Sequence, residues 1–118
     1  MRNKNTQGRV VKLSSSKCVG GIVRAYSKLQ EAFAEKLEKD ESVKDFKCNV
    51  ELIQLEGLEG IYTTDFVVTK HSGEVHVWEC VKRDYLTKPL TTKVLDASRN
   101  YWKLKRGIEW GIVTDAKK

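Results

Sequence analysis

An acidic and a basic side chain, Asp65 and Lys82, lie in apolar surroundings on either side of a short polar turn. Asp65 interrupts the β-branched and aromatic segment 61–69, where a carboxylate is costly to bury unless it is paired or binds a metal. Lys82 ends the returning segment 74–82, and the turn His71–Gly73 joins the two segments as a hairpin. Such a hairpin brings Asp65 and Lys82 towards one end, where we expect either a structural ion pair or a catalytic centre.

The two side chains have chemistry suited to the hydrolysis of a phosphodiester bond. Such reactions are commonly assisted by Mg²⁺ or Mn²⁺, held by oxygen ligands, which neutralise charge and activate a water molecule. A lysine next to that water can orient it and stabilise the charge that develops on the phosphate. Structural ion pairs also place acids beside lysines, so this pair by itself leaves both interpretations open.

The charge distribution favours a partner that carries phosphate groups. The chain has 118 residues and a net charge of +6. Residues 1–30 contain no acid, residues 31–60 contain nine acids against four lysines, and residues 82–106 contain eight basic residues against two acids. Two basic segments separated by an acidic one predict a polarised surface of the kind that binds nucleic acid. The candidate phosphate contacts are Lys12, Lys17, Arg83, Lys88, Lys93 and Arg99.

Length and hydropathy limit the architecture to one small domain. We expect residues 1–20 to form a basic arm and residues 21–118 to form a single domain. No apolar segment approaches the roughly 18 residues that a membrane span needs, and the N-terminus has no apolar segment typical of a secretory signal. The sequence therefore predicts a soluble protein of the cytoplasm, without membrane partners, in which the cysteines stay reduced.

Apolar periodicity predicts the elements that carry these side chains. Steps of three and four residues between apolar positions predict a helix over 21–39. Alternation and β-branched residues predict strands, bounded by turn residues. The predicted strands are 43–55, 61–69, 74–82 and 108–114.

A second helix is predicted between the third and fourth strands. It follows Lys88-Pro89, with Thr91 or Thr92 as its N-cap, and Gly107 suits the position just after its end. The order α-β-β-β-α-β predicts an α/β fold in which helices flank a sheet.

The residues around the hairpin also resemble a known family. The similarity runs in order through residues 12–115 and includes Tyr26–Phe33, Thr64–Phe66, Glu79–Lys82 and Gly107–Asp115. These segments resemble the PD-(D/E)xK nuclease core and, more narrowly, the catalytic N-terminal domain of TnsA-like endonucleases. The resemblance implies a restriction-endonuclease-like core with a mixed sheet. It also implies a metal-dependent DNA endonuclease of transposon-end or phage DNA processing, in a bacterial or phage-infected cell.

The resemblance implies a role for each matching position. Asp65 would be the central metal ligand and Lys82 the catalytic lysine, while Val81 would offer its backbone carbonyl to the metal. Gln30 stands where the family has a glutamate in its first helix. Cys80 stands where the family has the acid or amide of (D/E)-x-K.

Gln30 and Cys80 depart from the family pattern and weaken the implied metal site. A glutamine can ligate through its amide oxygen but brings no charge, and a thiol is a soft ligand for Mg²⁺. The neighbouring acids Glu31 and Glu79 are alternative ligands. Regular geometry disfavours both, because Glu31 lies about 100° round the helix from Gln30 and Glu79 points to the opposite face of its strand from Lys82.

Two functional hypotheses follow from these residues. The first is a DNA endonuclease that uses Mg²⁺ or Mn²⁺; the second is a catalytically inactive DNA-binding or interaction module with the same fold. Since one centre cuts one strand at a time, we expect a homodimer or a heteromeric nuclease or transposase partner. Full-length transposon-end nucleases carry a further C-terminal domain, so the length favours a stand-alone or phage-type nuclease, or an isolated domain.

Overall fold

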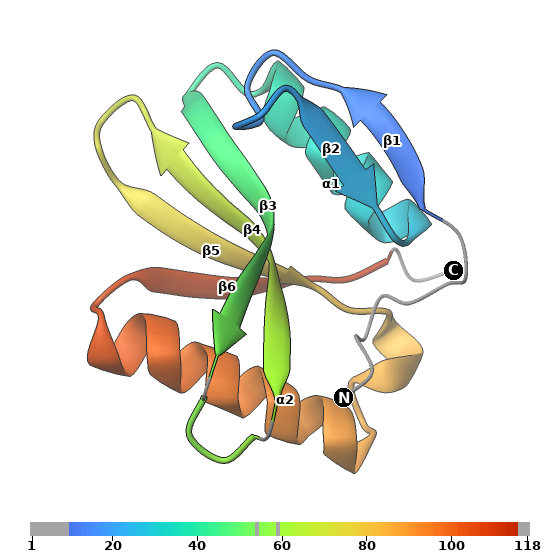
Figure 1. Ribbon diagram of the computed structural model, residues 1–118, viewed down its shortest axis with the longest axis vertical. Helices are drawn as coiled ribbons and strands as arrows, with labels where there is room; N and C mark the ends of the chain where they lie inside the picture. The colour runs from blue at the N-terminus through green and yellow to red at the C-terminus, as the bar shows by residue number, and fades with distance from the viewer. Residues whose placement is uncertain (1–9, 54, 59, 116–118) are drawn as a thin grey trace.

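A four-stranded mixed sheet lies between two helices (Figure 1). The computed structural model describes residues 10–53, 55–58 and 60–115. The strands are β3 (Val43–Ile53), β4 (Ile61–Lys70), β5 (Val75–Cys80) and β6 (Glu109–Val113), and the helices are α1 (Lys28–Lys39) and α2 (Pro89–Arg99). Neighbouring strands follow the order β3-β4-β5-β6, antiparallel except for the parallel pair β5–β6. The predicted α/β fold with a mixed sheet and flanking helices is confirmed, and each predicted strand is present within two residues of its bounds.

A separate two-stranded hairpin precedes α1. Its strands β1 (Val11–Ser14) and β2 (Ile22–Ala25) pair antiparallel. The prediction of a helix from residue 21 is therefore wrong over residues 21–27. The β-branched Ile22 and Val23 favour a strand, and α1 begins only after Ser27, whose hydroxyl accepts a hydrogen bond from the backbone N–H of Gln30 at 3.1 Å.

The segment after β1, expected as part of a basic arm, packs on the sheet. Cys18 is buried and pairs with Phe46 in an isolated parallel bridge. The Lys17 ammonium donates to the backbone carbonyl of Asp40 at 2.6 Å, at the end of α1. Apolar side chains within the basic segment thus anchor it to the core. Residues 1–9 of the expected arm lie outside the described residues.

The helix α2 begins at a proline rather than at a threonine cap. Pro89 occupies its first turn and Lys88 is the N-cap, so the prediction of Thr91 or Thr92 as N-cap is wrong. Proline suits this position because its fixed φ is helical and its missing N–H would have no partner there. A short 3₁₀ turn, η1 (Arg83–Tyr85), connects β5 to this helix.

The same helix ends in a π-helical segment, η2 (Asn100–Lys105). Gly107 follows with φ +67°, and its N–H donates to the carbonyl of Lys103 at 3.1 Å. Glycine adopts this left-handed conformation without strain, as the sequence predicted for the end of this helix.

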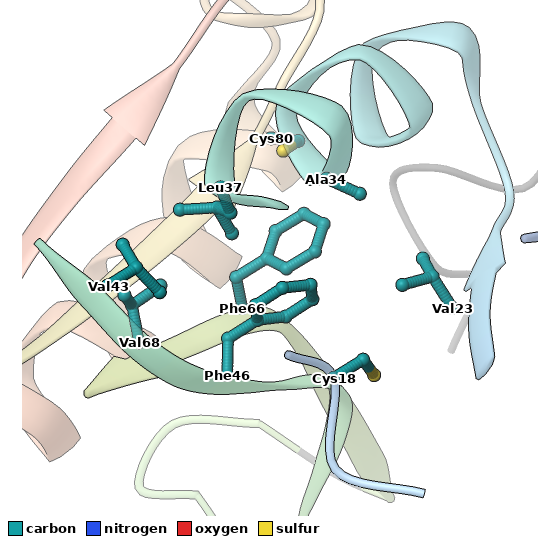
Figure 2. Packing of buried hydrophobic residues seen from close by; sticks show 9 residues of the cluster. All are labelled: Cys18, Val23, Ala34, Leu37, Val43, Phe46, Phe66, Val68 and Cys80. Atoms are coloured by element: carbon teal, nitrogen blue, oxygen red, sulfur yellow. The ribbon is translucent and has the colours of Figure 1, made fainter. Parts of the chain in front are cut away.

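Two apolar clusters fill the two faces of the sheet. In the α1-side cluster, Ala34 and Leu37 of α1 cover Phe46 and Phe66, whose rings lie beside each other with centroids 5.8 Å apart (Figure 2). The α2-side cluster joins the other face of the sheet to α2 and η2. Its buried members are Leu52, Leu55, Tyr62, Val77, Val94, Ala97 and Trp102.

The strands β3 and β4 change face at the centre of the sheet. Phe46 belongs to the α1-side cluster, but Leu52, an even number of residues later, belongs to the α2-side cluster. The same change occurs in β4 between Tyr62 and Phe66. Asn49, with φ +54°, is the one non-glycine of positive φ among the described residues. The change of face therefore coincides with a backbone irregularity at Asn49.

Candidate active site

Asp65 is fully buried, and both of its carboxylate oxygens accept hydrogen bonds. Oδ1 accepts from Nε2 of Gln30 at 2.8 Å, and Oδ2 accepts from the backbone N–H of Cys80 at 2.6 Å. The backbone N–H of Asp65 donates to Oε1 of Glu79 at 3.4 Å. A carboxylate removed from water requires such donors in place of the lost hydration. The structure thus joins α1, β4 and β5 at Asp65.

The side-chain amide of Gln30 has one orientation that satisfies its neighbours. The backbone N–H of Tyr26 donates to its Oε1 at 2.7 Å, and its Nε2 donates to Oδ1 of Asn49 at 3.1 Å as well as to Asp65. Nδ2 of Asn49 donates in turn to the backbone carbonyl of Arg24 at 2.7 Å. A backbone N–H can only donate and a carbonyl can only accept, so these two groups fix both amides. Gln30 therefore presents its nitrogen, not its oxygen, to Asp65.

Gln30, rather than Glu31, is the helix residue that contacts Asp65. The Gln30 side chain is 1% exposed. Glu31 is half-buried, and its backbone N–H donates to the carbonyl of Ser27. Because Ser27 caps the helix, its position sets which side of α1 turns towards the sheet.

Glu79 lies on the opposite face of the sheet from Gln30. It is fully buried, and its Oε2 accepts from the hydroxyl of Ser98 in α2 at 2.6 Å. The Ser98 oxygen accepts from the indole N–H of Trp110 at 3.2 Å. Strand alternation predicted this face for Glu79, and its carboxylate is bound to α2 rather than directed towards Gln30.

Cys80 contributes its backbone, while its side chain belongs to the α1-side cluster. Figure 2 places the Cys80 sulfur beside α1, and the residue is fully buried. Its N–H binds Asp65, as described above. Val81 is also buried, and its N–H donates to the carbonyl of Val113 at 2.9 Å, which holds the end of β5 against β6.

Lys82 is exposed and lies beyond the end of β5, where it precedes η1. It lies near Asp115, which follows β6. The backbone N–H of Arg83 donates to Oδ1 of Asp115 at 2.7 Å. This bond, followed by the positive charges of Arg83 and Lys82, lowers the pKa of Asp115. The two basic side chains and this carboxylate thus gather at one end of the sheet.

The six candidate phosphate contacts come from β1 and the segment after it, from η1 and the turn after it, and from α2. Five of them are exposed, but the Lys17 ammonium is bound at the end of α1 and is the least suited to contact DNA. Lys12 and Arg24 are direct partners across the β1–β2 hairpin, and both are exposed. Like charges at such positions repel each other unless an anion lies between them. The exposed candidates are Lys12, Arg83, Lys88, Lys93 and Arg99.

A polar cavity lies beside Asn49. It has a volume of about 280 Å³ and is lined by Arg24, Tyr26, Cys48, Asn49, Glu51 and Thr63. A larger, apolar cavity of about 490 Å³ lies between α1 and β5, where His76 stacks on Trp78 with ring centroids 4.0 Å apart. The smaller cavity is lined by Asn49, the partner of Gln30, but not by Gln30 or Asp65, which are both buried.

Sequence reasoning missed Asn49 and Ser98. Asparagine is depleted in strands and tolerates positive φ, so its place within the predicted strand 43–55 was a usable signal. No motif indicated Ser98, because its role depends on α2 packing over Glu79.

Carboxylate and amide oxygens, which Asp65 and Gln30 contain, are the kind of ligand that a hard divalent cation prefers. Asp65 offers carboxylate oxygens, and Gln30 offers an amide oxygen only if its amide turns over. The Cys80 thiol does not fit, because it is soft and lies in an apolar cluster. Within residues 10–53, 55–58 and 60–115, no three His, Cys, Asp or Glu side chains form a group that could hold a metal ion. Among the four ligands that the family resemblance implies, Asp65 is the one carboxylate.

Comparison with known proteins places the chain in a family. The family model described as TnsA-like endonuclease N terminal matches residues 40–115, which is more than half of the chain. The match contains Asp65, Cys80 and Lys82, and it begins after α1, which carries Gln30. No curated protein matches this sequence. No helix in the described part of the chain is long and apolar enough to cross a membrane. The chain therefore belongs to the family of TnsA-like endonuclease N-terminal domains, which are restriction-endonuclease-like domains of the PD-(D/E)xK type.

Proposed function

We propose that this domain is a metal-dependent DNA endonuclease of transposon-end or phage DNA processing, which hydrolyses phosphodiester bonds at Asp65. The observation that carries this proposal is the fully buried Asp65 carboxylate, where α1, β4 and β5 meet in a domain of this family. A buried carboxylate is costly for stability, and an apolar residue of similar size would avoid that cost. Its presence at the family's central position favours a catalytic role.

Each residue of the site has a part in the proposed reaction. Asp65, the backbone carbonyl of Val81 and the turned amide of Gln30 would hold Mg²⁺ or Mn²⁺. The bound cation supplies charge neutralisation at the phosphate and an activated water. Lys82 orients the attacking water and stabilises the charge that develops on the phosphate oxygens.

The exposed basic side chains bind the DNA backbone and carry no sequence preference of their own. The facing pair Lys12 and Arg24 supports this part of the proposal, because bound phosphate would relieve their repulsion. Binding should weaken with salt, by roughly 0.9 in the slope of log affinity against log salt for each phosphate contact. A homodimer or a transposase-like partner would supply the second centre for a double-strand cut in the cytoplasm.

Plasmid nicking tests the proposal directly. Purified protein is incubated with supercoiled plasmid and Mn²⁺, beside Asp65→Ala, Lys82→Ala and a control, Lys44→Ala, which removes an exposed charge from β3. We expect nicking by the wild type and by the control, and its loss in the two site variants. Nicking that survives Asp65→Ala in a folded protein would overturn the proposal.

A second candidate function is a catalytically inactive DNA-binding module. It is favoured by the orientation of Gln30, whose nitrogen satisfies Asp65 without any cation. Fluorescence anisotropy with a labelled duplex distinguishes the two functions. Saturable binding without nicking, at protein and Mn²⁺ concentrations well above those needed for binding, would identify the module.

A further inference from the structure

Asn49 connects β2, β3 and α1 at the point where β3 changes face. We propose that Asn49 is a positioning residue that holds the Gln30 nitrogen against Asp65, so that a divalent cation is taken up only after the Gln30 amide turns over. This role rests on the proposed metal-dependent function, because it concerns the cation that Asp65 would hold.

Two backbone groups, one an acceptor and one a donor, fix the orientation of the side-chain amides of Asn49 and Gln30. The Arg24 carbonyl accepts from Nδ2 of Asn49, which leaves the Asn49 oxygen facing Gln30. That oxygen can only accept, so it draws the NH₂ group of Gln30. From the other side, the Tyr26 N–H draws the Gln30 oxygen. Each hydrogen bond in this series, from β2 to Asp65, therefore has a fixed donor and a fixed acceptor.

The backbone conformation at position 49 does not by itself require an asparagine, so the side chain has a role of its own. Glycine adopts a φ of +54° at least as readily as asparagine. Conformation alone would therefore be satisfied by glycine. The asparagine adds two hydrogen bonds, at 2.7 Å to the Arg24 carbonyl and at 3.1 Å to the Gln30 amide.

A half-turn of the Gln30 amide would reverse every polar contact that it makes. Its oxygen would face the oxygens of Asn49 and Asp65, and its nitrogen would face the Tyr26 N–H. A cation between Gln30 and Asp65 compensates the contact with Asp65. It leaves the two other contacts unfavourable. Asn49 therefore opposes the orientation of Gln30 that a cation requires.

The test is Asn49→Gly, which preserves the backbone conformation and removes the side chain. Metal-free protein is titrated with Mn²⁺ by calorimetry, and the Gln30 side-chain NH₂ signals are recorded by ¹⁵N NMR. We expect the variant to bind Mn²⁺ about fivefold more tightly, the factor that corresponds to one neutral hydrogen bond. The Gln30 NH₂ signals should shift and exchange faster with water. A purely structural loss would weaken Mn²⁺ binding, so the direction of the change is diagnostic.

Asn100→Ala is the matched control, because it removes an exposed amide from η2 and should bind Mn²⁺ as the wild type does. Equal or weaker Mn²⁺ binding by folded Asn49→Gly, no binding by any variant, or unchanged NH₂ signals would each overturn the proposed role. Tighter Mn²⁺ binding without plasmid nicking by any variant would support the role of Asn49 and refute the nuclease function. Plasmid nicking together with unchanged Mn²⁺ binding by Asn49→Gly would support the nuclease function and refute the role of Asn49.

Discussion

Replacing the Gln30 amide by a carboxylate, Gln30→Glu, measures how much a neutral side chain stabilises the Asp65 centre. The introduced oxygen would stand where the nitrogen now lies, 2.8 Å from Oδ1 of Asp65 and 3.1 Å from Oδ1 of Asn49. Two unit charges about 2.8 Å apart repel by about 6 kcal/mol at an effective dielectric constant of about 20. Without a cation, the folded protein must relieve this repulsion.

Protonation of the introduced carboxyl costs less free energy than the repulsion between two carboxylates. Keeping a carboxyl with an ordinary pKa of about 4.3 protonated costs about 1 kcal/mol at pH 5 and about 4 kcal/mol at pH 7. Both values are below the repulsion energy, so protonation sets the loss of stability. The folded variant then binds more protons than its unfolded state, because the pKa of the introduced carboxyl is raised on folding. Its stability relative to wild type therefore falls as pH rises from 5 to 7.

Urea unfolding, followed by tryptophan fluorescence in the presence of a chelator, measures this loss at pH 5, 6 and 7. The control Asn100→Asp introduces a carboxylate at an exposed position and should change stability little at each pH. Mn²⁺ should restore part of the lost stability in Gln30→Glu, because the cation replaces the proton. A loss below about 1 kcal/mol at pH 7, or one that does not vary with pH, would refute the assigned orientation of Gln30.

Three further predictions concern the surroundings of the site. Thr64→Val and Trp102→Phe each remove one partner of a buried hydrogen bond of 3.0 Å. A double-mutant cycle, measured by urea unfolding, should therefore give a coupling free energy of about 1 kcal/mol. Additive losses of stability would contradict this prediction. Hydrogen bonds, that of the Ser15 hydroxyl first, lower the pKa of Glu38 from 4.5 to about 2. The stability difference between wild type and Glu38→Gln should therefore be full above pH 4.5 and shrink as pH falls towards 2. Burial above all raises the pKa of the Cys18 thiol to about 12, so this thiol should react slowly at pH 8. Cys18→Ser should therefore leave unchanged the number of thiols that react rapidly in a disulfide-exchange assay at about pH 8.

The sheet and the pairing of its central hairpin were predictable because their signals are local. Alternation, β-branched residues and the turn His71–Gly73 determine β4 and β5 within a short segment. Alternation also predicted the face of Glu79. The family resemblance implied Gln30 beside Asp65, and the helical repeat disfavoured its neighbour Glu31.

The remaining features depend on contacts between distant segments. The apolar residues from Ile22 onward fit a helical repeat, but pairing with β1 and the cap at Ser27 make Ile22–Ala25 a strand. The orientation of Gln30 depends on Tyr26, Arg24 and Asn49, whose proximity follows from the hairpin and from the irregularity in β3. Tertiary contacts here override local preference.

The change of face at Asn49 divides the domain into two layers, and the α1-side layer is the one that covers Asp65. The α1-side layer closes over Asp65 through Gln30, whereas Glu79 and Ser98 bind within the α2-side layer. A local opening of α1 and the hairpin would therefore expose Asp65 while α2 stays in place. Amide hydrogen exchange at Tyr26, whose N–H binds Gln30, then reports how often the site opens. We expect that rate to limit how quickly any cation or phosphate reaches Asp65.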